Sequence, residues 1–207
     1  MSSKNYLSIY AKSFNWAGFF LPKKTYKNCS YLYDFCRVVD NIADDENEIE
    51  IKKIKFQKFV SDFKQKNFEN PVIQNMWNII HEFNISLEII YDLFDGIESD
   101  IKQNVKIDTR KDLLIYCYRV AGTVGLMMAK ILNVNKKQSL KSAIDLGIAM
   151  QLTNISRDVI EDSKKNRSYI NGNFEEINST IKLADTFYKN SFYSIREIPL
   201  SFRFSIL

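Results

Sequence analysis

The sequence predicts an all-α protein, and three observations carry that prediction. The chain has 207 residues but only 3 Pro and 6 Gly, so few positions interrupt a helix. Apolar residues recur with helical spacing along nearly the whole chain, and no two segments alternate as paired strands do. Hydrophobic residues make up 45% of the composition, enough for a sizeable core, so residues 1–207 are expected to form a single domain.

The first part of the chain divides into helices at a proline and at polar segments. The apolar spacing predicts a helix over 3–20, stopped by Pro22. A second helix begins near Thr25 and carries "YLYDFCRVVDNIADD". The polar segment 46–70 is expected to be a solvated helix with a loop at "KNFENP".

Cap residues place the helices that follow. Pro71 suits the first turn of "VIQNMWNIIHEFN", because a first-turn residue needs no backbone N–H partner. Ser86 is a candidate cap for "LEIIYDLFDGIESDI". Asp108 and Thr109 mark the start of "KDLLIYCYRVAGTVGLMMAKILNV". Small residues in that segment permit close approach by a neighbouring helix or a ligand: Ala121, Gly122 and Gly125.

The rest of the chain predicts two more helices. One runs over 137–163 and ends in the polar stretch "SKKNRSYINGN", and the last ends before Pro199. No repeat of fixed period, low-complexity tract or domain linker is visible.

Charge and cysteine usage limit the setting and the partners. The net charge of +4 is too small to indicate a nucleic-acid partner. The 3 cysteines are odd in number, lack metal-site spacing and follow no signal peptide, which favours a reducing compartment. No apolar run approaches the ~18–20 residues that span a bilayer. We therefore expect a cytoplasmic protein, with peripheral membrane association as an alternative.

Two segments crowd carboxylates onto a helix. "FCRVVDNIADDENE" places Asp40 and Asp44 four residues apart, and "QLTNISRDVIEDSKKNRSYI" places Asn154, Asp158 and Asp162 at the same spacing. Residues four apart share a helix face, where like charges repel. A shared cation would relieve that repulsion, and clusters of oxygen ligands select hard cations, Mg²⁺ above all.

The alternative interpretation of each acidic pair is an ordinary solvated helix face. We expect that alternative to hold for Asp45, Glu46 and Glu48, which continue into a polar stretch. It suits Asp40 and Asp158 less well, because apolar residues flank both positions. Arginines, whose planar donors fit phosphate, lie close to the acids in sequence: Arg37, Arg157 and Arg167.

With both acidic segments in view, the sequence resembles the squalene/phytoene synthase family, and within it the bacterial phytoene synthases. "AKSF" (11–14) resembles the family's N-terminal S-K-S-F element, and "YDFCRVVDNIAD" resembles its first aspartate-rich motif. "YCYRVAGTVGLMMAKILNV" (116–134) is similar to a helix typical of phytoene synthases. "DLGIAMQLTNISRDVIEDSKKNRSYI" (145–170) resembles the second aspartate-rich motif.

The resemblance implies an isoprenoid synthase helical bundle with a central cavity. It also implies a prenyltransferase that condenses two geranylgeranyl diphosphates head-to-head to phytoene, by way of prephytoene diphosphate, in carotenoid biosynthesis. Mg²⁺, with Mn²⁺ as a substitute, would be the cofactor, and no NADPH is expected. Two alternatives stay open: a squalene or hopanoid-pathway synthase that uses farnesyl diphosphate, and a catalytically incomplete fragment or partner subunit that binds prenyl diphosphate.

The resemblance also implies roles for individual residues. Five positions match metal ligands or their close support: Asp40, Asp44, Asn154, Asp158 and Asp162. Six would line the diphosphate region: Ser13, Arg37, Gln151, Arg157, Arg167 and Tyr169. Tyr116 and Phe14 would face the reacting carbocation, because an aromatic face stabilises a cation without quenching it. For Tyr116 the alternative is an ordinary core aromatic, with Tyr118 as the neighbour that matches instead.

The chain departs from the family pattern at two places. Ala11 stands where the family often has Ser, which removes one hydrogen bond to diphosphate. The chain also ends at "PLSFRFSIL", where the family continues into further helices. The sequence therefore predicts a bundle that is truncated at its C-terminus, with a partner that covers that end.

One prediction about substrate length rests on Gly18. On a helix Gly18 lies one turn beyond Phe14, and a glycine there costs about 1 kcal/mol relative to alanine. Space for a long prenyl tail would justify that cost; the alternative is close helix packing. Gly18→Phe is expected to block geranylgeranyl diphosphate and spare farnesyl diphosphate in a turnover assay with both. An equal loss with both substrates would contradict this role.

Overall fold

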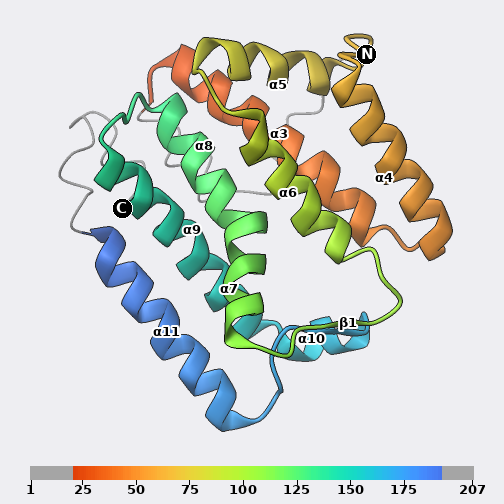
Figure 1. The fold of residues 1–207 in the computed structure, drawn as a ribbon, viewed down its shortest axis with the longest axis vertical. Coiled ribbons are helices and arrows are strands. Elements are labelled where there is room, and N and C mark those ends of the chain that lie inside the picture. Colours follow the sequence, from red (N-terminus) through yellow and green to blue (C-terminus); the bar gives the residue numbers. More distant parts are fainter. Residues whose placement is uncertain (1–20, 193–207) are drawn as a thin grey trace.

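The computed structural model describes residues 21–192, and these residues form a helical bundle (Figure 1). The all-α prediction is confirmed. The elements in chain order are α3 (Lys23–Asp44), α4 (Ile49–Lys64), α5 (Pro71–Glu82), α6 (Leu87–Ser99), β1 (Val105–Lys106), α7 (Arg110–Cys117), the π-helical turn η1 (Tyr118–Gly122), α8 (Thr123–Ile131), α9 (Lys137–Arg157), α10 (Val159–Lys164), β2 (Arg167–Ser168) and α11 (Phe174–Phe192). The predicted helix over 3–20 and the end of the last helix near Pro199 lie outside the described residues.

Three helices begin where the cap signals placed them. The Asn70 side chain accepts a hydrogen bond from the backbone N–H of Val72, with Pro71 as the first helical residue of α5. Ser86 caps α6 in the same way. Thr109 Oγ1 accepts from the Asp112 N–H at 3.1 Å and starts α7. Each cap satisfies a backbone donor that the first turn of a helix leaves unpaired.

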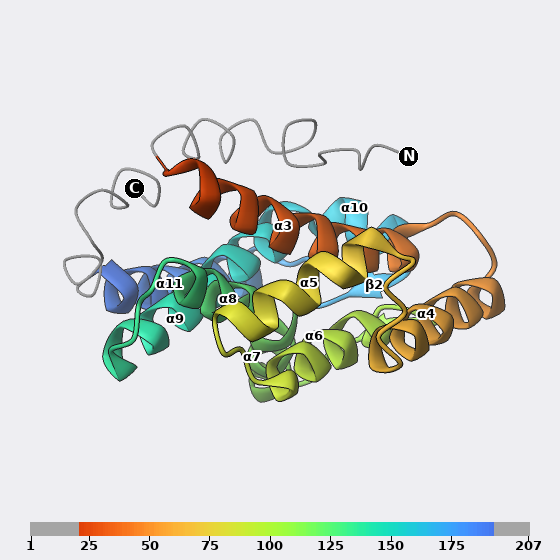
Figure 2. The same cartoon turned by 90° about the horizontal axis from the view of Figure 1, so that it is seen from above.

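A cluster of buried aromatic rings fixes the acidic end of α3 against its neighbours. Phe35 of α3 is fully buried, with its ring centroid 5.6 Å from that of Phe63 and 5.9 Å from that of Phe94. Phe63 also stacks on Trp77, whose indole N–H donates to the Phe63 carbonyl at 3.0 Å. These contacts join α3, α4, α5 and α6. Turned by 90°, the bundle has α3 along one face and α6 along the opposite one (Figure 2).

Two glycines bring α9 into backbone contact with the helix that precedes it. A Cβ at Gly147 of α9 would lie 2.3 Å from the carbonyl oxygen of Ala121 in η1. A Cβ at Gly125 of α8 would lie 2.2 Å from the carbonyl oxygen of Ala143 in α9. Both distances exclude a side chain. The expected close approach at Gly125 is therefore a helix–helix crossing.

Two details of the predicted elements are wrong. The helix expected over 137–163 is interrupted at Asp158, whose φ of −100° and ψ of 14° leave the α-helical range. In the two preceding turns Thr153 and Ser156 bond back to the carbonyls of Ala149 and Leu152, a pattern that bends helices.

The second detail is a short strand pair where the sequence predicted none. β1 and β2 pair in parallel, with Val105 opposite Arg167 and Lys106 opposite Ser168. The backbone N–H of Val105 donates to the Asn166 carbonyl, and that of Ile107 donates to the Ser168 carbonyl. With two residues in each strand, the pair has no alternating pattern for a sequence to show. It ties the loop after α10 to the loop after α6.

The helical span Arg110–Ile131 also corrects an expectation. By length and composition it is apolar enough to cross a membrane, with a mean hydropathy of 1.2, although no such segment was predicted. The span comprises α7, η1 and α8, which pack against α6 and α9 in the bundle. Figure 1 shows it between those two helices.

Candidate active site

A cavity of about 240 Å³ opens where α3, α6, α7, η1 and α9 meet. One part of its wall is polar and another is apolar. The polar residues are Arg37, Asp40, Asp100 and Gln151, with Tyr33 and Tyr116 beside them. The others are Cys36, Leu93, Ile97 and Val120. A ligand with an anionic head and a hydrocarbon tail would suit such a wall. The structure thus brings four predicted site residues together: Arg37, Asp40, Tyr116 and Gln151.

The first acidic segment points into this cavity from the last turns of α3. Arg37 Nη1 donates to Asp40 Oδ2 at 2.9 Å, one turn along the helix. Desolvation raises the pKa of Asp40, the nearby Asp44 charge raises it further, and Arg37 opposes both effects. Asp40 and Asp44 therefore repel each other as predicted, and arginine relieves part of that repulsion.

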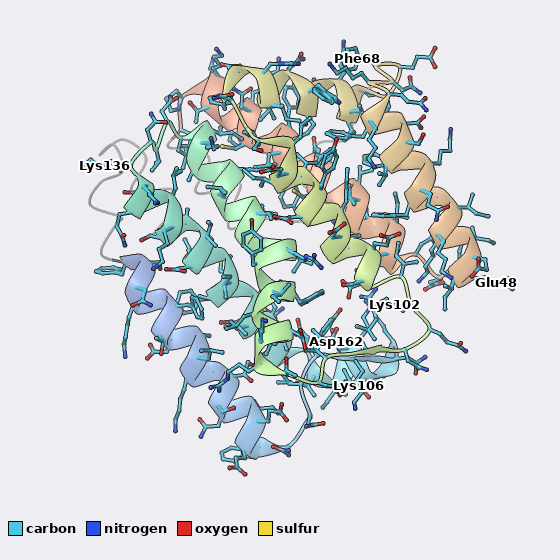
Figure 3. All side chains as sticks on the ribbon, viewed as in Figure 1. Glu48, Phe68, Lys102, Lys106, Lys136 and Asp162 are labelled. Carbon is cyan, nitrogen blue, oxygen red and sulfur yellow. The ribbon has the colours of Figure 1, made fainter. Side chains whose placement is uncertain are left out.

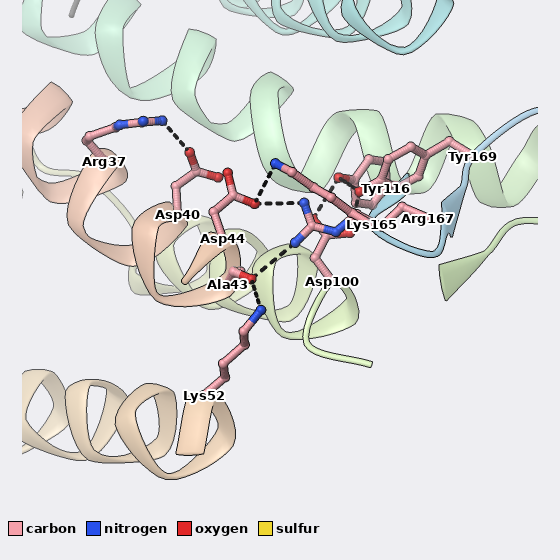
Figure 4. A network of polar contacts seen from close by, with 10 residues as sticks. All are labelled: Arg37, Asp40, Ala43, Asp44, Lys52, Asp100, Tyr116, Lys165, Arg167 and Tyr169. Carbon is pink, nitrogen blue, oxygen red and sulfur yellow. Dashed lines mark hydrogen bonds and ion pairs between the residues drawn. The ribbon is translucent and has the colours of Figure 1, made fainter. Parts of the chain in front are cut away.

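Arg167 joins the two acidic segments. Its guanidinium donates to Asp44 Oδ1 at 2.7 Å and to the Ala43 carbonyl at 3.2 Å, and Lys165 lies 3.9 Å from the same Asp44 oxygen (Figure 4). Desolvation raises the pKa of Asp162 of α10. The Arg167 charge lowers this pKa and the Asp44 charge raises it, so Asp162 lies close to both residues. Two positively charged side chains, those of Arg167 and Lys165, thus lie where the two acidic segments approach each other.

The remaining residues of the second segment lie outside the cavity wall. Arg157 makes a two-pronged bond to Asp158, with Nε–Oδ1 and Nη2–Oδ2 both 2.6 Å, and this bond lowers the Asp158 pKa. Asn154 is half-buried on α9, and its carbonyl accepts from the Asp158 N–H. Figure 3 shows Asp162 on α10. Because the helix breaks at Asp158, the single face predicted for Asn154, Asp158 and Asp162 is not continuous.

Asp100 is a site residue that sequence reasoning missed. It follows the end of α6 and accepts hydrogen bonds from Tyr116 at 2.8 Å and Tyr169 at 2.7 Å (Figure 4). The two tyrosine rings stack with centroids 4.7 Å apart. Desolvation raises the Asp100 pKa, and both tyrosine bonds oppose it. A lone aspartate after an amphipathic helix carries no sequence signal for such a cluster.

Three predicted site residues lie outside the described residues: Ser13, Phe14 and Gly18. Tyr118, the alternative to Tyr116, donates to Asp92 at 2.9 Å and is not part of the cavity wall. The structure therefore favours Tyr116 as the cavity residue. Lys165, which sequence reasoning did not select, joins Asp44 beside Arg167.

The residues fit a metal ion in donor chemistry. Asp40 and Asp44 offer carboxylate oxygens four residues apart, which suit Mg²⁺. Within residues 21–192 no group of three or more His, Cys, Asp or Glu side chains converges closely enough to hold an ion. This set suits a cation that is bound by one or two carboxylates and completes its shell with water and phosphate oxygens, as Mg²⁺ does.

Comparison with known proteins decides the family. The squalene/phytoene synthase family profile matches residues 7–173, most of the chain. The chain belongs to the squalene/phytoene synthase family. It is similar to a phytoene synthase from Pseudescherichia vulneris, with 32% identity over 172 residues, which cover 77% of this chain and 55% of that protein. The chain thus spans about half the length of this relative.

Three further proteins are similar to this chain over most of its length. A 4,4'-diapophytoene synthase from Staphylococcus haemolyticus is 32% identical over 193 residues, 87% of this chain and 67% of that protein. A solved dehydrosqualene synthase in complex with ligand superposes with a TM-score of 0.84 at 28% identity, covering 97% of this chain and 78% of that one. A squalene synthase from Alicyclobacillus acidocaldarius, at 17% identity and a TM-score of 0.78, shares the fold. The isoprenoid synthase bundle is confirmed.

Proposed function

We propose that this protein is a prenyltransferase that condenses two geranylgeranyl diphosphates head-to-head to phytoene. The cavity carries the proposal, because Arg37, Asp40 and Gln151 share it with an apolar wall that includes Leu93 and Val120. Such a cavity suits a diphosphate head and an isoprenoid tail. At about 240 Å³ the cavity is smaller than the usual ligand pocket of ~300–1,000 Å³, so residues 21–192 enclose only part of a long prenyl chain.

The residues of the site have separate tasks in this proposal. Arg37 and Arg167 orient the diphosphate through planar guanidinium donors, and Gln151 adds an amide donor. Asp40 and Asp44 would hold one Mg²⁺ or Mn²⁺ ion, and Asn154, Asp158 and Asp162 of the second segment would hold another. When bound, the metal neutralises charge on the departing diphosphate. Tyr116 and the apolar wall keep water from the allylic cation, and no NADPH takes part.

The main competing function is condensation of farnesyl diphosphate, as in a squalene or hopanoid-pathway synthase. The relatives named diapophytoene synthase and dehydrosqualene synthase favour keeping this alternative. A direct test separates the two. The purified chain is incubated with Mg²⁺ and either labelled geranylgeranyl or labelled farnesyl diphosphate, and the extracted lipids are identified. Phytoene from the longer substrate supports the proposal, and product from the shorter substrate alone contradicts it.

The dependence on metal is a second prediction. EDTA is expected to abolish turnover, and Mg²⁺ is expected to restore it. The reason is that Asp40 and Asp44 carry the same sign of charge as a diphosphate and repel it unless a cation intervenes. Lipid product is measured before and after dialysis against each divalent ion. Full turnover in EDTA would remove the metal role of both acidic segments.

A further inference from the structure

Asp100 bonds to Tyr116 and Tyr169 beside the cavity, and the proposed chemistry gives this carboxylate no task. Asp100 and Tyr116 line the cavity, and Tyr169 stacks against Tyr116 from the strand-pair side. Tyr116 is 8% exposed and Tyr169 is 6% exposed, so protein surrounds both phenols. A half-buried carboxylate beside two buried phenols is costly to desolvate, and a role in the cavity would account for it.

The three oxygen contacts of the cluster leave no phenolic proton for the cavity. Tyr169 donates to Asp100 Oδ1, and Tyr116 donates to Asp100 Oδ2. The Tyr116 and Tyr169 oxygens are also 3.1 Å apart. Each phenol has a single proton, and the Asp100 carboxylate accepts both of these protons in hydrogen bonds. The contact between the two phenolic oxygens therefore has no proton of its own. The Tyr116 oxygen therefore offers lone pairs, and not a donor, to anything beside it.

The surrounding fold holds this arrangement in place. Asp100 caps the end of α6, where its backbone N–H bonds to the Ile97 carbonyl. Tyr169 directly follows β2, which the two hydrogen bonds to β1 tie to the loop after α6. The Arg167 charge acts on both Asp100 and Tyr169, and Figure 4 draws all three residues in one network. The cluster thus links the cavity wall to the arginine that holds Asp44.

We propose that Asp100 is a positioning residue that draws the protons of Tyr116 and Tyr169 away from the cavity, so that Tyr116 presents oxygen lone pairs and its free ring surface to a prenyl carbocation. A hydroxyl proton aimed at a cation would repel it, whereas lone pairs and a ring quadrupole attract it. The two phenols donate to different oxygens of Asp100, and Asp100→Asn replaces one of them by an NH₂ donor, so the phenol that faces the NH₂ must turn its proton elsewhere. This inference rests on the function proposed above.

The test measures binding of a cation mimic. A prenyl tertiary amine, protonated at neutral pH, is compared with its uncharged carbon isostere by calorimetry in the presence of Mg²⁺ and inorganic diphosphate. The protein is expected to bind the amine at least about tenfold more tightly than the isostere. Asp100→Asn should remove most of that preference, and Tyr116→Phe should remove the share that the hydroxyl oxygen supplies, because Phe keeps the ring. The double variant should lose no more than either.

The bond between Tyr118 and Asp92 provides a matched control. Tyr118 donates to Asp92 from η1 to α6, which repeats the aspartate–tyrosine bond outside the cavity wall. Asp92→Asn should keep the full preference for the amine. Thermal melts of all variants report folding, and Tyr116→Phe leaves the Asp100–Tyr169 bond in place if Asp100→Asn does not fold.

Three results would overturn the role of Asp100. They are a wild-type protein with no preference for the amine, a preserved preference in Asp100→Asn or in Tyr116→Phe, and losses that add in the double variant. Additive losses would mean that Asp100 acts by its own charge and not through Tyr116. Turnover of prenyl diphosphate is assayed separately. If the wild-type protein forms product and Asp100→Asn keeps the full preference for the amine, the role of Asp100 is rejected and the proposed function stands.

Discussion

Asp40→Asn is expected to lower turnover by about 100-fold or more while leaving the protein folded. The Asp40 carboxylate faces the cavity beside Arg37. The Asn side chain is uncharged, so it binds a metal ion more weakly than the carboxylate does. Folding should change little, because removing one of two like charges at i,i+4 gains about 0.2–0.5 kcal/mol and offsets the weakened Arg37 bond. Product formation and thermal melting are measured on the same preparation.

Asp45→Asn is the matched control for this variant. Asp45 follows α3 directly, pairs with Lys55 at 2.6 Å and is not part of the cavity wall. It should keep wild-type turnover. If Asp40→Asn instead melts far below wild type while its folded fraction turns over normally, Asp40 is a structural residue and the metal assignment fails.

Asp158→Asn is also expected to lower turnover by orders of magnitude while leaving the protein folded, if the second acidic segment takes part. In the structure Asp158 is paired with Arg157 and does not line the cavity. A loss of turnover as large as that of Asp40→Asn would mean that this pair opens when substrate and metal bind. Wild-type turnover would leave Asp158 with only its local bond to Arg157.

Local patterns in the sequence predicted the parts of the structure that depend on local contacts. The helix starts at Pro71, Ser86 and Thr109 depend on bonds within three residues, so residue type and position suffice to locate them. The Arg37–Asp40 pair is also local, one turn apart on α3. Helical periodicity gave the all-α class for the same reason, because it reports which face of each segment is buried.

The features that the sequence did not reveal depend on contacts between distant segments. Asp100 meets Tyr116 and Tyr169, which lie 16 and 69 residues further along the chain. No spacing rule connects such positions. The break at Asp158 was missed for another reason: Thr153 and Ser156 bend the helix through bonds to its own carbonyls, without the Pro or Gly that usually signals an interruption.

Gly147→Ala is expected to destabilise the protein by about 2 kcal/mol or more, the largest effect on folding among these predictions. The new Cβ would lie 2.3 Å from the Ala121 oxygen and 2.7 Å from the Ala121 carbonyl carbon, which are backbone atoms that cannot rotate away. The gain in helix propensity, about 1 kcal/mol, offsets only part of this clash. For a chain of this size the melting temperature should fall by roughly 4 °C or more.

Gly172→Ala is the control, because its nearest neighbour is a methyl group of Val159 at 3.1 Å, a side-chain atom that can shift. This variant should melt at or slightly above the wild-type temperature, since alanine restricts the unfolded chain more than glycine does. Gly147→Ala should also lower turnover, because α9 carries the cavity residue Gln151 four positions after this crossing. A Gly147→Ala protein that melts with wild type would show that α9 and η1 have room between them, and the cavity wall would then not depend on this crossing.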